Sequence, residues 1–301
     1  AFKISVGTGI NPATHFKEYL INSGSSTDFL GFDSGERKIS SFIPRRVNNN
    51  DLEMVDKLIK EGFREEWSLD TRDALPNLSL SLLAQKSINN SKGAFGITAA
   101  ANYTKSTLVY RDMQNSRFGV YNTVEDKPEY IYKYNDHQYN SDVRGGAMIN
   151  LAWMGNRDKI EWRTIFNILG KNRYTVRDGW QNASALYLQE KYEYIYSSRS
   201  TLTTQLSGRH DRTNGFGEWS ISYSSAKMDQ PDRRIINREE NRIVGDEHFG
   251  KMAIDQNQIT RDFVTLDENI ATAAMSYTLD LSKGGPTEAE LVTGLLGEYR
   301  G

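Results

Sequence analysis

The feature that most constrains this chain is a period-two alternation of apolar and polar residues, which returns in segment after segment. Within 95–103, apolar Phe95, Ile97 and Tyr103 alternate with Gly96 and Thr98. Successive side chains of a strand point to opposite faces, so each segment predicts a strand with one apolar side. About nine such segments recur, starting near residues 2, 78, 95, 143, 160, 192, 219, 273 and 291. We therefore expect an all-β fold.

The connections between these segments alternate in length. Short turns are predicted at 89–93, 155–158, 209–217 and 282–287, and long polar stretches separate them at 12–76, 111–137, 171–190 and 226–266. Outer-membrane barrels have tight periplasmic turns and long extracellular loops. Long structureless connections are uncommon in compact domains. The alternation therefore favours an antiparallel transmembrane β-barrel over a sandwich or propeller.

Composition is compatible with strands that cross a membrane. The mean hydropathy is −0.63 and no run of eighteen apolar residues occurs, which argues against a transmembrane helix. A barrel strand shows lipid only every second side chain, so its hydropathy is low. The sixteen tyrosines suit a membrane interface. A net charge of −2 and no cysteine give no indication of nucleic-acid binding or of a disulfide scaffold.

One stretch departs from the strand pattern. Residues 51–63 place apolar side chains at helical spacing at Leu52, Val55, Leu58 and Ile59. Asp51 can cap such a helix, and Gly62 can end it. We expect a short amphipathic helix in the first long loop, packed on the barrel mouth. An interfacial membrane helix is less favoured, since its polar face is not enriched in Lys and Arg.

The sequence predicts no catalytic, cofactor-binding or metal-binding residue, and we expect no enzyme. Val6-Gly7-Thr8-Gly9 lacks the third glycine and the following helix of a dinucleotide site, so it predicts a strand end. The four histidines show no zinc spacing, and we expect them on surface loops and a turn: His15, His137, His210 and His248.

Two acidic clusters could bind calcium or supply a glycosidase carboxylate pair. Solvated loop charge is the favoured interpretation, because long polar loops carry many carboxylates. The clusters are Asp229, Asp232, Glu239 and Glu240, and Asp262, Asp267 and Glu268.

Several segments resemble TonB-dependent receptors of the Bacteroidetes, the group that includes SusC-like nutrient importers. They are KISVGTG at 3–9, STDFLGFDSGER at 26–37, YNDHQY at 134–139, FNILGKNRY at 166–174 and QPDRR at 230–234. Their order and spacing agree with the family over most of residues 1–300.

The resemblance implies a partial barrel domain over residues 1–301. Such receptors close a 22-stranded barrel around an amino-terminal plug and import scarce or large nutrients with energy passed by TonB. This chain shows no plug and no final aromatic-ended strand, so both ends are expected to lie within a longer protein. About nine strands, long extracellular loops and one short loop helix would belong to this sequence.

The same resemblance implies the cell outer membrane of a Gram-negative bacterium as the location. The parent would couple to TonB through its plug, contact outer-membrane lipid, and possess a SusD-like surface lipoprotein partner if it is SusC-like proper. No nucleic-acid partner is implied. External loops and lumen-facing residues would bind the ligand, which stays open among glycan, peptide, metal chelate and cobalamin.

Sidedness of one strand makes this expectation concrete. One face, with Ile160, Trp162 and Phe166, would meet lipid, and the other, with Glu161, Arg163 and Asn167, would line the lumen.

Two alternatives stay open. A secreted all-β carbohydrate-binding module or polysaccharide hydrolase would use loop aromatics such as Trp180 and Tyr187 to stack on sugar, and would fold without detergent. A passive porin or adhesin barrel would have no plug.

Overall fold

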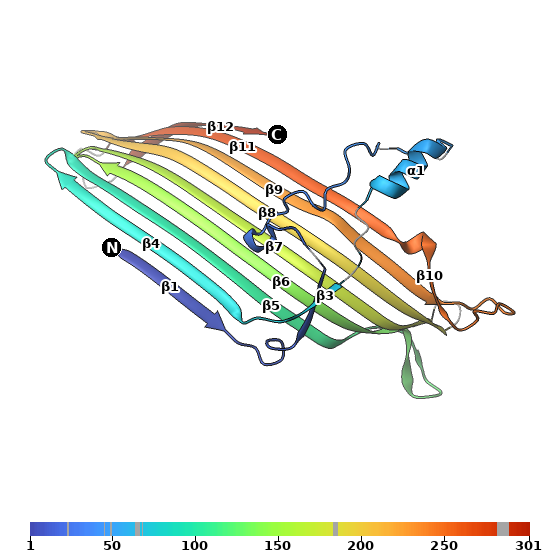
Figure 1. Ribbon diagram of the computed structural model, residues 1–301. Helices are drawn as coiled ribbons and strands as arrows, with labels where there is room; N and C mark the ends of the chain where they lie inside the picture. The colour runs from blue at the N-terminus through green and yellow to red at the C-terminus, as the bar shows by residue number, and fades with distance from the viewer. Residues whose placement is uncertain are drawn as a thin grey trace.

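The computed structural model describes residues 1–22, 24–44, 46–48, 50–63, 67, 69–182, 186–281 and 289–301. Most of these residues belong to one curved antiparallel sheet (Figure 1). Its strands are β1 (Phe2–Gly9), β4 (Asn77–Asn90), β5 (Gly93–Asn122), β6 (Lys127–Met154), β7 (Asp158–Asn182), β8 (Leu186–Arg212), β9 (Gly215–Glu240), β10 (Met252–Ile254), β11 (Thr260–Asp280) and β12 (Glu290–Arg300). Outside it lie β2 (Glu18–Asn22), β3 (Leu69–Asp73), α1 (Leu52–Glu61) and the 3-10 turns η1 (Asp28–Leu30) and η2 (Gln256–Gln258).

The sheet is a meander. Its order is β1-β4-β5-β6-β7-β8-β9-β11-β12, with β10 paired to β9, so most strands pair with their neighbours in sequence. Each of the nine alternating segments is a strand of this sheet, which confirms the all-β prediction. The edge strands β1 and β12 lie at opposite margins and the sheet is not closed (Figure 1). Among the described residues, no helix is long and apolar enough to cross a membrane.

Cross-strand register places the alternating apolar residues on one face. Phe95 of β5 pairs with Trp153 of β6, which pairs with Ile160 of β7. Further along, Ala101 pairs with Ala147, which pairs with Phe166. Directly paired residues share a face, so one side of the sheet collects the apolar rows and the other collects the polar residues between them. We call these the apolar face and the polar face.

Three of the four stretches predicted as long loops are largely strand. β5 continues to Asn122 and β6 resumes at Lys127, while β9 extends to Glu240. Residues 171–182 belong to β7. The prediction was wrong because charged and amide side chains are mixed there with aromatic ones, so the apolar alternation is weak while the backbone ladder continues. Polar cross-strand pairs replace it, as where Arg177 Nε donates to Asp136 Oδ1 at 2.7 Å.

The short turns are tighter than expected. Residues 91–92 connect β4 to β5 and 155–157 connect β6 to β7, as predicted. The predicted turn at 209–217 is reduced to 213–214, and Gly215 beside it has φ of +144°, which favours glycine. The turn predicted at 282–287 lies outside the described residues.

Long strands project far beyond the apolar rows. β5 has 30 residues, a span of roughly 100 Å at the usual rise per residue. A tilted strand needs roughly ten residues to cross a bilayer. Most of β5 is therefore available for structure outside such a layer.

The connection from β1 to β4, residues 10–76, folds back over the apolar face, and we call its described part the strap. It contacts the sheet away from the short turns: Tyr103 Oη donates to the Phe29 carbonyl at 2.8 Å, and Ser198 Oγ donates to the Gly31 carbonyl at 2.6 Å. A small apolar core forms between the two ends of the strap and the sheet from Tyr19, Ala74 and Val109, with Ile21 and Tyr139 packed against it.

The strap also holds a buried histidine near its start. His15 is 2% exposed, and its Nδ1 accepts from the Asn11 backbone N–H at 2.8 Å. The expected surface location is therefore wrong for His15, whose imidazole closes a turn. His137 and His210 lie in β6 and β8, and His248 lies in the connection after β9.

The predicted helix forms as α1. The Asp51 carboxylate accepts from the Met54 backbone N–H at 3.1 Å, as an N-cap does. Gly62 follows the helix with φ of −73°, so it needs no left-handed conformation. Leu58 is buried, but Leu52 and Ile59 are exposed, and α1 reaches beyond the outline of the sheet (Figure 1). The expected packing of its apolar face is therefore limited to part of that face.

A glycine pair lets the strap lie flat on the sheet. A Cβ on Gly170 of β7 would lie 2.6 Å from Gly31 Cα, while a Cβ on Gly96 of β5 has no neighbour nearer than 4.0 Å. We expect Gly170→Ala to cost about 1–3 kcal/mol of strap attachment through overpacking and to leave the sheet folded. The measurement is the rate of protease cleavage within the strap. Equal rates in Gly170→Ala and the control Gly96→Ala would contradict this arrangement.

Candidate membrane and ligand surfaces

An uncovered apolar band crosses the sheet between the short turns and the strap. Its members come from every long strand: Leu80, Leu82, Phe95, Ile97, Ile149, Leu151, Ile160, Trp162, Phe166, Leu202, Leu206, Ile221, Met275 and Leu295. Phe166, at its centre, is 38% exposed even though strands flank it on both sides. Within the part of the chain that the structure describes, no second layer covers this band, although an apolar sheet face needs an apolar neighbour.

The height of the band suits a bilayer. In β7 the apolar row runs from Ile160 to Ile168, and in β5 it runs from Phe95 to Tyr103. At about 3.3 Å per residue each row spans roughly 26 Å along its strand. Tilting shortens that span, so it compares with the apolar belt of roughly 25 Å on outer-membrane barrels.

Aromatic side chains mark the limits of the band. Phe95 and Tyr103 bound the row in β5, and Trp219 and Tyr223 bound it in β9. The indole of Trp219 donates to His210 Nε2 at 3.0 Å. A polar atom that has a hydrogen-bond partner within the sheet can be buried away from water. Aromatic girdles flank the apolar belt of membrane barrels.

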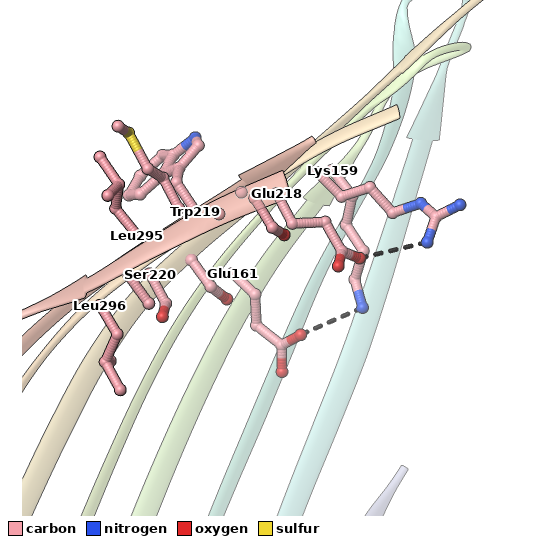
Figure 2. Close-up of a pocket in the computed structure, with 14 residues that line it drawn as sticks. Lys159, Glu161, Glu218, Trp219, Ser220, Leu295 and Leu296 are labelled. Atoms are coloured by element: carbon pink, nitrogen blue, oxygen red, sulfur yellow. Dashed lines mark hydrogen bonds and ion pairs between the residues drawn. The ribbon is translucent and has the colours of Figure 1, made fainter. Parts of the chain in front are cut away.

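The opposite face is charged at the same height. Glu161 accepts from Arg163 Nη2 at 2.6 Å and pairs with Lys159 at 3.1 Å. Arg209 pairs with Glu218 at 3.1 Å. Figure 2 shows this sidedness beside β12, where Trp219 and Leu295 point to one side of the ribbon and Glu161 to the other.

The sidedness predicted for β7 is confirmed. Ile160, Trp162 and Phe166 stand on the apolar face, and Glu161, Arg163 and Asn167 stand on the polar face.

Two depressions are candidate ligand sites. The first, of about 650 Å³, lies between β7 and β12 and takes residues from both faces, with Glu161 and Glu218 on one side and Trp219 and Leu295 on the other (Figure 2). The second, of about 490 Å³, lies on the polar face nearer the projecting strand ends and is lined by polar and charged groups: Gln138, Asn140, Asp142, Arg144, Lys171 and Arg173. The lining of the second depression suits a ligand with many hydrogen-bonding groups.

A buried ion cluster attaches the strap to β8. Arg37 Nη1 donates to Asp28 Oδ1 at 2.7 Å and to Asp33 Oδ1 at 2.8 Å, and its guanidinium lies 4.2 Å from the Tyr196 ring centroid. Burial alone would lower the pKa of Arg37, but the hydrogen bonds and charges of both carboxylates raise the pKa overall. The Asp33 side chain is 1% exposed, so it depends on this cation.

A second attachment uses a β-bulge. Register shifts between Tyr194 and Ser198 and between Asp262 and Val264 place Asp232 at φ of 57°. Asp232 is 4% exposed and accepts from Arg261 Nε at 2.6 Å. The expectation of solvated loop charge is therefore wrong for Asp232.

The same bulge aims Arg234 at the strap. Its Nη2 donates to Asn22 Oδ1 at 2.7 Å, and its guanidinium lies 5.0 Å from the Trp67 ring centroid and 4.8 Å from that of Tyr194. Cation–π contacts of desolvated arginines are worth about 2 kcal/mol or more.

The sequence predicted the strands that form these surfaces but not the contacts between these strands and the strap. The row Tyr139, Tyr174 and Tyr194 under the strap has ring centroids 6.1 Å and 4.7 Å apart. Tyrosines at every second position predicted a strand at 192–196, but nothing in the sequence shows that the strap covers them. The bulge determines where Arg234 meets the strap, and no local sequence pattern predicts the bulge.

The remaining candidates are dispersed. Asp262 pairs with Arg233 at 3.4 Å, and no group of three His, Asp or Glu among the described residues could hold a metal ion. Trp180 lies in β7 against Tyr130, with ring centroids 6.1 Å apart, and Tyr187 lies in β8. Neither aromatic belongs to the loop expected under the carbohydrate-binding alternative.

Comparisons with known proteins add no assignment. Searches against family models, curated proteins and solved structures found no match to this chain.

The Arg37 cluster makes a prediction about strap attachment. Arg37→Gln leaves Asp33 buried without a cation, at a cost of about 3–5 kcal/mol. The matched control is Arg72→Gln, since the Arg72–Asp70 pair lies in exposed parts of the same segment and such pairs contribute about 0–1 kcal/mol. The measurement is hydrogen exchange of the strap amides in each variant. Similar protection in the two variants would argue against an attachment through Arg37.

Asp229 makes a prediction about pH. Burial, and the nearby charge of Asp33, raise the pKa of Asp229 above its ordinary value. The folded state therefore binds this proton more tightly than the unfolded state, and the stability that protonation contributes is lost as pH rises through the folded pKa.

Removing the charge should reverse that loss. We expect Asp229→Asn to stabilise the strap at pH 7 and to have no effect near pH 3, where the carboxyl is protonated in both states. Exposed Asp267 supplies the control, Asp267→Asn. The measurement is hydrogen exchange of the strap amides at both pH values. Destabilisation of the strap by Asp229→Asn at pH 7 would contradict the expected direction of the effect.

Proposed function

We propose that the apolar band faces the lipid of an outer membrane and that the polar face lines the interior of a β-barrel to which this chain contributes. The observation that carries the proposal is an apolar row repeated on one face of successive antiparallel strands and left uncovered. An apolar patch of more than a few hundred Å² is unusual on a soluble protein. Lipid is the neighbour that would cover a belt of this height on every strand at once.

The complete barrel would act in energised uptake of a nutrient, as in the TonB-dependent receptors whose segments these resemble. Strands that extend far beyond the band support this proposal, because they provide an external surface for ligand capture. The charged polar face supports it too, because it supplies lumen-facing side chains. In this proposal a plug outside residues 1–301 couples the barrel to TonB, and a surface lipoprotein is a further partner if the receptor is SusC-like.

The second depression on the polar face is the proposed contact for the ligand. Arg144, Lys171 and Arg173 lie there beside Asp142 and the amides of Gln138 and Asn140. Paired charges and amides suit hydroxyl and carboxylate groups. The band itself provides no such groups, so transport specificity would depend on this face and on the projecting strands.

Charge placed on the two faces tests the membrane assignment. We expect Phe166→Arg to hinder insertion of the complete gene product by about 2–4 kcal/mol if Phe166 lies near the midplane. The neighbouring change Asn167→Arg points to the polar face and should cost much less. The measurement is the yield of folded protein in lipid vesicles. Equal yields would sink the assignment, and folding of the complete product without detergent or lipid would support the secreted all-β alternative.

A further inference from the structure

Three exposed apolar side chains of the strap lie where the band ends. Phe29, Leu30 and Phe32 are 54%, 43% and 40% exposed, and they surround Gly31. The backbone of this turn is fixed to the sheet, because the Phe29 carbonyl accepts from Tyr103 Oη at 2.8 Å. These side chains are therefore exposed on an anchored turn.

The contacts of this turn, residues 29–32, show where it lies along the strands. Tyr103 and Ile168 end the apolar rows of β5 and β7, and a Cβ on Gly31 would lie 3.3 Å from Ile168 Cγ1. Gly31 and Gly170 approach so closely that neither could carry a side chain without a shift. The turn accordingly lies against the apolar face, at the border of the band farther from the short turns.

Burial in the turn differs from that of an ordinary water-exposed loop. The ion pair of Asp33 and Arg37 is buried, with side chains 1% and 5% exposed, while Glu36 and Lys38 are exposed. The large apolar side chains of the turn are turned outward. Gly31 permits this with φ of +90°, which an L side chain rarely adopts.

We propose that Phe29, Leu30 and Phe32 insert into the outer-leaflet lipid at the boundary between headgroups and acyl chains. This inference rests on the proposed function, because it takes the band below the turn to be in lipid. Continuity selects lipid as the occupant: the turn extends the apolar surface directly beyond Tyr103 and Ile168. Aromatic side chains at that depth are typical of membrane anchors. The strap would then be held between the sheet and the membrane surface.

The chain contains no cysteine, so an engineered cysteine can report the environment of one position. The test uses the complete gene product, with any cysteine outside residues 1–301 replaced by serine, in phosphatidylethanolamine–phosphatidylglycerol vesicles. Phe29→Cys is labelled with an environment-sensitive fluorophore and exposed to a lipid-borne quencher or to aqueous iodide. Phe166→Cys reports the band. Leu52→Cys of α1 and Val124→Cys of the β5–β6 turn, which are 76% and 93% exposed at the native residues, report water.

We expect the lipid quencher to reach positions 29 and 166, and iodide to reach 52 and 124. Quenching by lipid at 166 but by iodide at 29 would overturn the inference and leave the proposed function intact. Iodide quenching at 166 would overturn the proposed function, and the inference with it. Protection of position 29 from both quenchers, with position 166 in lipid, would overturn the inference but not the proposed function. It would indicate a second protein chain over the turn.

Discussion

The structure depends on a single-layer sheet whose backbone is hydrogen-bonded strand to strand while one of its faces is apolar. Among the described residues, such a sheet leaves two surfaces without a partner: its open edges at β1 and β12, and its apolar band. Closure into a barrel within lipid would give both a partner. The charged residues of the opposite face, such as Glu161 between Lys159 and Arg163, would then face water.

Beyond the band, stability has a different source. The strands continue with charged and amide side chains mixed among tyrosines, and cross-strand pairs such as Asp136–Arg177 accompany the backbone ladder. The strap covers part of this region through buried cations that lie on aromatic rings, Arg37 on Tyr196 and Arg234 on Tyr194. Each cation is desolvated, so its carboxylate or amide partner is required to offset the cost of burial.

The strap also separates two parts of the apolar face. Where it lies on the sheet, tyrosines are buried; below it, Phe166 and Trp162 are uncovered. A single face thus passes from protein-covered to uncovered along the same strands, and the Gly31–Gly170 contact marks the transition. The proposed lipid contact lies at one level of the strands. The strap and the proposed ligand contact lie together at the next level, on opposite faces of the sheet.

The sequence by itself determined the strands, their sidedness and the capped helix, because period-two alternation and an N-cap at Asp51 are local signals. It did not reveal that 111–137 and 226–266 are mostly strand, since charged and apolar residues are mixed there without a clear period of two. Only the tertiary structure decided where the strap lies, that His15 and Asp232 are buried, and which cations meet Tyr194 and Tyr196. Those outcomes depend on contacts between residues far apart in the sequence, such as Arg37 with Tyr196 and Arg234 with Asn22, and on a bulge that redirects side chains. No local sequence pattern predicts either.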